Sequence, residues 1–138
     1  MAANTNPIYS RTADIQWPTT AIATANTAKD GTGTVHTVFT ADATEGGWVG
    51  VLVARAAGTN VATVLRVFIN NGSSNAPPGN NILRHELTLP ATTLSEVAQL
   101  APYEMPLNIN LPAGYKINCT IGTTVAAGYY LSINGGKY

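Results

Sequence analysis

Short apolar runs recur along the chain, and turn residues separate them. The runs are rich in β-branched and aromatic side chains, and Gly, Pro, Asn or Asp residues bound each of them. No long stretch has the spacing of an amphipathic helix. Short strands at this spacing are typical of an all-β fold, and we expect an antiparallel, jelly-roll-like β-sandwich of about eight strands. The expected strands span residues 19–25, 34–41, 48–56, 61–70, 82–89, 94–100, 107–111, 115–121 and 125–133.

The alternation within these runs predicts which side of each strand is buried. In residues 115–121, Tyr115, Ile117, Cys119 and Ile121 share one face, which we assign to the core. Residues 47–54 and 64–69 are apolar on both faces. In an antiparallel sheet this predicts central strands that are also covered on their second side. The cover could be an N-terminal arm, a loop such as 73–81, or another subunit.

Residues 1–20 have neither helical nor strand periodicity and are interrupted by two prolines. We interpret them as an extended N-terminal arm and residues 21–138 as the β-sandwich domain. The arm is more apolar than a solvated tail requires, so it should pack on its own sandwich or on a neighbour, although a floppy terminus is the alternative. Residues 92–96 could open a short helical turn instead of a strand. The large side chains of the arm are Ile8, Tyr9, Ile15 and Trp17.

Charge is scarce on this chain. Charged residues make up 10% of its 138 residues, against about 25% in a typical soluble domain. Either Thr, Asn and Ser solvate the surface, or other protein covers much of it. The seven Lys and Arg residues are scattered and balance seven Asp and Glu, so we expect no direct nucleic-acid binding.

The chain also lacks the features of an exported or membrane protein. Its start has no signal-peptide pattern and no apolar run is long enough for a membrane helix, so we expect synthesis in the cytosol and no membrane contact. The single cysteine, Cys119, lies on the apolar side of its predicted strand, where a free thiol behaves as a small hydrophobic group.

Catalytic and metal-binding signals are missing. His36 and His85 have no carboxylate or cysteine at a ligand spacing, and Asp42 with Glu45 lacks the dense oxygen pattern of a calcium loop. No nucleophile elbow, P-loop or dinucleotide fingerprint is present. The dispersed carboxylates could still assemble a glycosidase pair in three dimensions. We expect a protein that is not an enzyme, with no catalytic residues, metal, cofactor or small-molecule ligand.

Two charges lie inside otherwise apolar strands. Arg66 and Glu86 should be paired, either with each other across a sheet or across a subunit boundary. We predict that these two residues and several residues of the arm bind a partner. The candidate partner-binding residues are Ile8, Tyr9, Arg11, Ile15, Trp17, Arg66 and Glu86.

Four stretches together resemble small virion-associated β-sandwich proteins of tailed bacteriophages, the capsid decoration or cement proteins. The resemblance covers roughly residues 34–138 and consists of an apolar strand that ends in Asn-Gly followed by a Leu-Pro-x-Gly turn. The stretches are GTNVATVLRVFINNGSSN (58–75), NNILRHELTLPATTLSE (80–96), LPAGYKINCTIG (111–122) and GYYLSINGGKY (128–138).

The resemblance implies a non-enzymatic protein on the outer surface of the virion capsid. Such a protein would bind the major capsid protein, form homotrimers and stabilise contacts between capsid subunits. The alternative is a tail-associated or head-fibre jelly roll that binds host-surface glycans. In that case exposed aromatic rings would be the stacking platforms, drawn from Trp48, Tyr103, Tyr129, Tyr130 and Tyr138.

Overall fold

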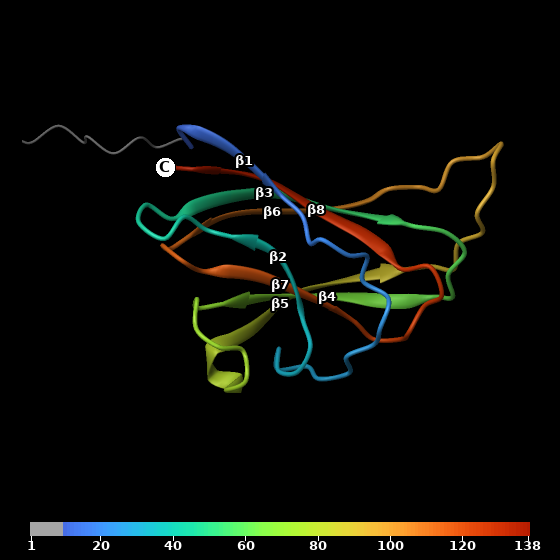
Figure 1. The fold of residues 1–138 in the computed structure, drawn as a ribbon, viewed down its shortest axis with the longest axis horizontal. Helices are drawn as coiled ribbons and strands as arrows, with labels where there is room; N and C mark the ends of the chain where they lie inside the picture. The colour runs from blue at the N-terminus through green and yellow to red at the C-terminus, as the bar shows by residue number, and fades with distance from the viewer. Residues whose placement is uncertain (1–9) are drawn as a thin grey trace, which may run out of the picture.

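The computed structural model describes residues 10–138, which form an all-β structure of two four-stranded antiparallel sheets. The sheets lie as two layers, and the C-terminus ends beside the first strand (Figure 1). Sheet A has the order β1 (Thr12–Gln16), β8 (Tyr129–Lys137), β3 (Gly47–Ala56) and β6 (Tyr103–Leu111). Sheet B has the order β2 (His36–Thr40), β7 (Lys116–Ile121), β4 (Thr63–Asn70) and β5 (Asn81–Leu89). One short 3-10 turn, η1 (Pro78–Asn80), precedes β5.

The core lies between the two sheets and is built from the alternate apolar positions of the strands. In β7, Ile117, Cys119 and Ile121 are fully buried, as the alternation predicts. Cys119 is a free thiol, and burial raises its pKa, so the predicted core cysteine is confirmed. In β5 more and less exposed positions alternate, and Ile82 and Glu86 are among the exposed ones, although the pairing with β4 shifts register between Val67 and Phe68.

Two predicted strands do not form. Residues 19–25 make only one bridge, between Ile22 and Tyr129, because this segment crosses from one sheet to the other and buries Ile22 on the way. Residues 94–100 form an irregular loop that projects at one end of the molecule (Figure 1). Val97 is 97% exposed there, since no neighbouring strand is within reach to pair with this segment. A helical turn does not form at residues 92–96 either.

One strand was missed, and it lies inside the predicted arm. β1 pairs antiparallel with β8, from Thr12 opposite Lys137 to Gln16 opposite Ile133. The Gln16 side-chain amide then closes the gap to sheet B: it donates to the carbonyl of Thr40 and accepts from its N–H, both at 2.9 Å. This part of the arm therefore packs on its own sandwich. Ile8 and Tyr9 lie outside the described residues.

The chain itself covers the outer face of sheet B. Phe68 points away from the core and is fully buried beneath the loop of residues 26–34, where Gly31 lies against its ring. Asn75 holds this loop down by donating to the carbonyls of Gly31 and Gly33, at 3.0 and 2.8 Å. The sequence allowed an arm, a loop or another subunit to cover the second face of β4, and in the structure loops of the same chain cover it.

Candidate interaction face

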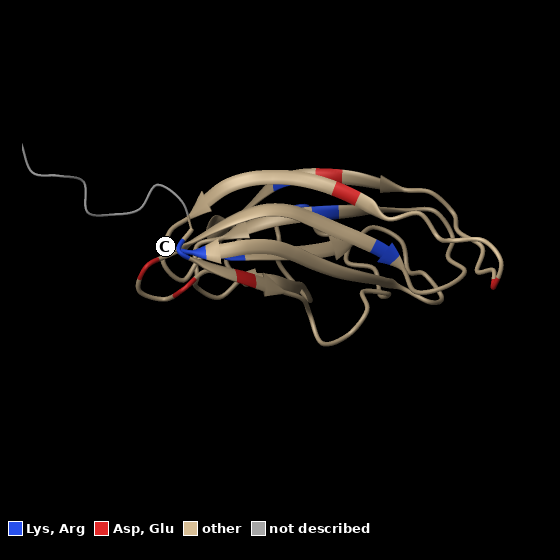
Figure 2. Ribbon diagram, turned by 90° about the horizontal axis from the view of Figure 1, so that it is seen from above, with Lys and Arg blue, Asp and Glu red and all other residues tan. Residues whose placement is uncertain are grey.

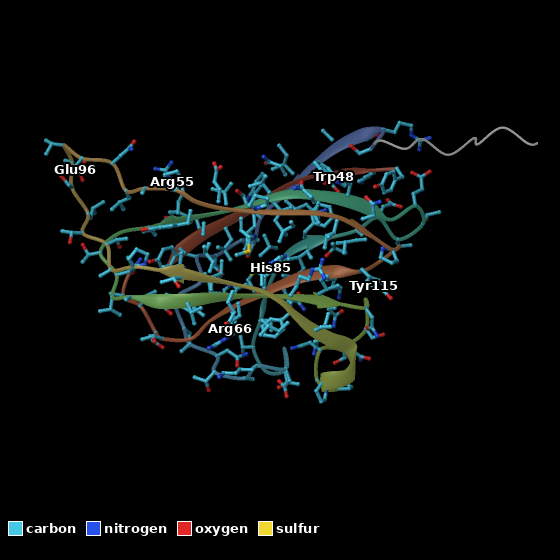
Figure 3. The ribbon with its side chains drawn as sticks, turned by 180° about the vertical axis from the view of Figure 1, so that it is seen from behind. Trp48, Arg55, Arg66, His85, Glu96 and Tyr115 are labelled. Atoms are coloured by element: carbon cyan, nitrogen blue, oxygen red, sulfur yellow. The ribbon has the colours of Figure 1, made fainter. Side chains whose placement is uncertain are left out.

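No comparable segment of residues 10–138 covers the outer face of sheet A. The outward positions of its central strand β3 are Trp48, Val51 and Val53, which are half-buried, and Arg55, which is exposed. Because every second residue of a strand faces the same side, the apolar character of β3 on both faces puts a row of hydrophobic side chains on this surface. Trp48 and Arg55 lie toward opposite ends of the row (Figure 3).

A glycine allows the tryptophan of this row to lie along the sheet. A Cβ placed on Gly50 would come within 2.7 Å of the Trp48 indole, so any other residue would push the ring away. Trp48 therefore covers a backbone that would otherwise be bare, at the position where β3 shifts register against both neighbours. Residues 10–138 leave its ring only half-buried, so the ring contributes to this surface.

Three large side chains on this face are strongly exposed. Ile15 of β1, Trp17 just after it and Tyr130 of β8 have 57%, 66% and 62% of their surface accessible. Charged positions are sparse on the coloured ribbon and gather mainly at the end beside the C-terminus, where Arg11 pairs with Glu45 and Lys137 with Asp42 (Figure 2). A surface with several exposed apolar groups and few charges is typical of a contact region. We call this surface, formed by Ile15, Trp17, Trp48, Val51, Val53 and Tyr130, the sheet A face.

One end of the sheet A face is hollowed. A depression of about 210 Å³ opens there, and we call it the Trp17 hollow. Its floor includes Val53 and Ser132, which are opposite each other in the register of β3 and β8. Arg55 and Tyr130, the next outward pair of the same two strands, form one end. The segment after β1 forms a side with Trp17, Pro18 and Thr20.

Arg55 supplies the charge of the hollow. One of its Nη atoms donates to the carbonyl of Leu100 at 3.3 Å. No carboxylate within residues 10–138 forms an ion pair with Arg55. Glu104 shares the outer face, opposite Val53 on β6, but is not among its ion-pair partners. The hollow therefore combines two exposed aromatic rings, an apolar floor and a guanidinium with free donors.

The predicted partner-binding residues are divided among three places. Ile15 and Trp17 lie on the sheet A face. Arg11 lies at one end of the sandwich, where one Nη atom binds both Glu45 carboxylate oxygens at 3.0 Å. That pair ties the start of β1 to the turn between β2 and β3. Because the pair is exposed, it contributes little to stability.

Arg66 and Glu86 form the cross-strand pair that was one of the two predicted alternatives. They are opposite each other in β4 and β5, and Arg66 Nε donates to Glu86 Oε1 at 2.9 Å. The Arg66 side chain is only 11% exposed, whereas that of Glu86 is half exposed. Figure 3 shows Arg66 on sheet B, away from Arg55. The pair belongs to the packing of sheet B.

Candidate acid–base and metal groups are dispersed in the structure as well. Within residues 10–138, no three His, Cys, Asp or Glu side chains come together as a metal site would require. Desolvation lowers the pKa of both His36 and His85, and the Arg84 charge adds to the effect at His85. Asp42 accepts hydrogen bonds from the N–H groups of Glu45 and Thr44, and these bonds lower the pKa of its carboxyl. The side chain therefore stabilises the turn.

The aromatic residues named as stacking platforms have different positions. Tyr129 is fully buried and Tyr103 is half-buried against the core, so neither offers a free ring. Tyr138 donates from its hydroxyl to Asn110. Among these residues only Tyr130 is both strongly exposed and part of the lining of the Trp17 hollow. Trp17, from the predicted arm, lines the same hollow. Val53, Arg55 and Ser132 were not predicted from the sequence, although the outward alternation of β3 and β8 was an available signal for them.

No helix in the described part of the chain has the length and apolar character needed to cross a membrane. Comparisons of the chain with protein-family models, with characterised proteins and with solved structures found no match. The resemblance to phage decoration proteins therefore stays a prediction from the residues.

Proposed function

We propose that this chain is a non-enzymatic structural protein of a tailed-phage virion, a decoration protein that binds the outer surface of the capsid. In this proposal it contacts the major capsid protein, associates with itself as a homotrimer and reinforces joints between capsid subunits. A protein that repeats one modest contact over a symmetric shell gains affinity from the repetition, so each contact can be weakly charged and of limited size.

The strand order supports the jelly-roll part of the proposal. The antiparallel partners are β1 with β8, β2 with β7, β3 with β6 and β4 with β5. This nested pairing is what results when one long hairpin, with its tip between β4 and β5, is wrapped around a two-layered core. Jelly rolls of this kind occur in viral capsid proteins and in lectins. The fold is therefore compatible with several functions, and the choice among them has to be argued from the residues on the surface.

The observation that carries the proposal is the uncovered sheet A face. The chain covers the outer face of sheet B with its own loops, but residues 10–138 leave Ile15, Trp17 and Tyr130 more than half exposed on sheet A. Uncharged surface of this kind can be buried against another protein without the desolvation penalty of charged groups. We assign this face to contacts with the shell or with a sister subunit.

The test is binding to heads. Purified protein is mixed with empty heads of the phage whose genome encodes it, and the bound fraction is measured by co-sedimentation. Ile15→Lys puts a charge within the proposed contact and should weaken binding roughly tenfold or more. Ile82→Lys is the matched control, because Ile82 is an isoleucine of similar exposure, 63%, on the edge strand β5 of the other sheet. Equal binding by both variants, or no binding by the wild type, would contradict the proposal.

A second candidate function rests on the Trp17 hollow. Exposed tryptophan and tyrosine rings beside a shallow depression are suited to stacking against a sugar ring, and the adjoining Ser132 and Arg55 can form hydrogen bonds to hydroxyls. This arrangement supports a module that binds host-surface glycans, located at the tail or on a head fibre. Binding of immobilised glycans together with localisation at the tail tip would favour this function over decoration.

A further inference from the structure

The Trp17 hollow has the size of a site for one ring. Its volume of about 210 Å³ is below the roughly 300–1,000 Å³ of typical pockets for whole small molecules. It is also open on one side, because both flanking rings are mostly exposed. A single ring or side chain therefore fits, as one unit of a longer chain that continues outside the hollow.

The lining of the hollow is mostly apolar, which suits the stacking face of a sugar ring. A pyranose has a C–H face that stacks on an aromatic ring and a rim of hydroxyls that needs hydrogen-bond partners. Trp17 and Tyr130 offer such aromatic surfaces, and each ring also has a polar edge. Ser132 and Thr20 add hydroxyls.

The charge of the hollow indicates the class of sugar. Arg55 is the cation in the lining, and its one hydrogen bond within residues 10–138 is to a backbone carbonyl, so most of its five N–H donors are free. A guanidinium with free donors in this fixed geometry binds a carboxylate through two parallel hydrogen bonds. The negative charge of Glu104, on the neighbouring strand β6, would repel an anionic ligand. Glu104 forms no ion pair with Arg55, so it does not occupy the donors of the guanidinium.

We infer that the Trp17 hollow binds an acidic saccharide, one sugar unit that carries a carboxylate, with the ring in contact with both Trp17 and Tyr130 and the carboxylate on Arg55. This inference rests on the second candidate function, glycan binding, and specifies its ligand. Other chains of the same lattice or the capsid shell are the competing occupants of this surface, and the experiment below separates them.

The experiment uses Trp17 as the reporter. The chain has two tryptophans, so Trp48→Phe leaves Trp17 as the only indole. Because Trp17 is 66% exposed, acrylamide quenches its fluorescence, and a stacked sugar should protect it. The probes are an oligogalacturonate and the same oligomer with its carboxylates methyl-esterified, which keeps the rings and removes the charge. We expect the acidic probe to protect Trp17 and to bind about tenfold more tightly than the ester.

Three variants test the roles of single side chains. Arg55→Gln keeps a polar group and should reduce the affinity for the acidic probe to that for the ester. Glu104→Gln removes the opposing charge and should raise the affinity for the acidic probe only. Tyr130→Ala should weaken the binding of both probes. If Trp48→Phe folds poorly, the shift of the Trp17 indole N–H in NMR spectra of the wild type, assigned with Trp17→Phe, gives the same readout.

The outcomes separate this inference from the proposed functions. Equal binding of the two probes would overturn the acidic preference and keep glycan binding. Protection by neither probe would overturn both. Protection of Trp17 that rises with protein concentration alone would show that a second copy occupies the hollow, and this would overturn the inference while supporting self-association.

Discussion

At the scale of single residues, buried polar side chains hold the ends of the sandwich together. Asn60 is almost fully buried, and its side-chain oxygen accepts from the N–H groups of Ala127 and Gly128, at 2.8 and 3.0 Å. Its amide nitrogen donates to the Gly128 carbonyl at 2.9 Å. One side chain thus binds three backbone groups of a loop that is far away in the sequence.

Asn60→Ala should lower the free energy of unfolding by about 2–4 kcal/mol, because it leaves the N–H groups of Ala127 and Gly128 without partners, while the Gly128 carbonyl keeps its hydrogen bond from the Ala57 N–H. Chemical denaturation measures the change. Asn134→Ala is the control, since Asn134 is exposed on β8, and it should change stability by less than about 0.5 kcal/mol. A small effect of the Asn60 variant would mean that water reaches this loop.

The two histidines predict how stability depends on pH. Desolvation lowers the pKa of His36 and His85 below the ordinary value of about 6.5, so the unfolded chain binds protons at a higher pH than the folded chain does. The stabilisation from neutral histidine is complete above pH ~6.5 and is lost as the pH falls through the folded pKa values. Asp30 and Asp42 also have lowered pKa values, but they act only near and below pH ~4.

We therefore expect the free energy of unfolding to fall between pH ~7.5 and ~5. The double variant His36→Gln/His85→Gln should show a flatter profile over this window, measured by urea denaturation at a series of pH values. A profile in the variant that is as steep as in the wild type would show that other groups cause the dependence.

At the scale of elements, most strands followed from their patterns, but the edge strand β1 did not. β3 and β4 were predicted within a few residues because their apolar runs are long and bounded by turns. β1 has only one large apolar residue, Ile15, and it faces outward. Its place in the sheet comes from backbone pairing with β8 and from the Gln16 amide, which no hydrophobic pattern reveals.

Gln16→Met keeps the length of the side chain but removes both hydrogen bonds to Thr40. We expect faster amide hydrogen exchange at Thr40 and along β1, together with a loss of about 1–2 kcal/mol in the free energy of unfolding. Exchange in β4 and β7 should change only by the global loss in stability. Gln99→Met, in the exposed loop between β5 and β6, should leave the exchange of β1 unchanged.

At the scale of the whole molecule, the two outer faces differ. Sheet B is covered by loops of its own chain, which bury Phe68 completely. On sheet A, Trp48 and Val51 are only half-buried, and described residues leave the face open. The low number of charged residues is therefore explained differently for the two faces. Loops of the chain cover the outer face of sheet B, and we propose that partners cover the outer face of sheet A.

The sheet A face predicts self-association of the purified protein. Sedimentation velocity should show an average mass that rises with concentration, because an exposed apolar surface with few charges offers little resistance to contact. Ile15→Lys should shift this equilibrium toward the monomer, whereas Ile82→Lys on sheet B should not. A wild type that stays monomeric at millimolar concentration would remove the main support for the assembly proposal.

The sequence by itself determined the all-β class, the buried face of the main strands, the core position of Cys119 and the low surface charge. These properties depend on alternation and composition, which are local and can be counted along the chain. Only the tertiary structure decided which edges are paired, which outer face is covered and that Trp17 meets Tyr130 and Arg55 in one hollow. Such contacts join residues far apart in the sequence, and they are set by the order in which strands pair, which no local pattern encodes.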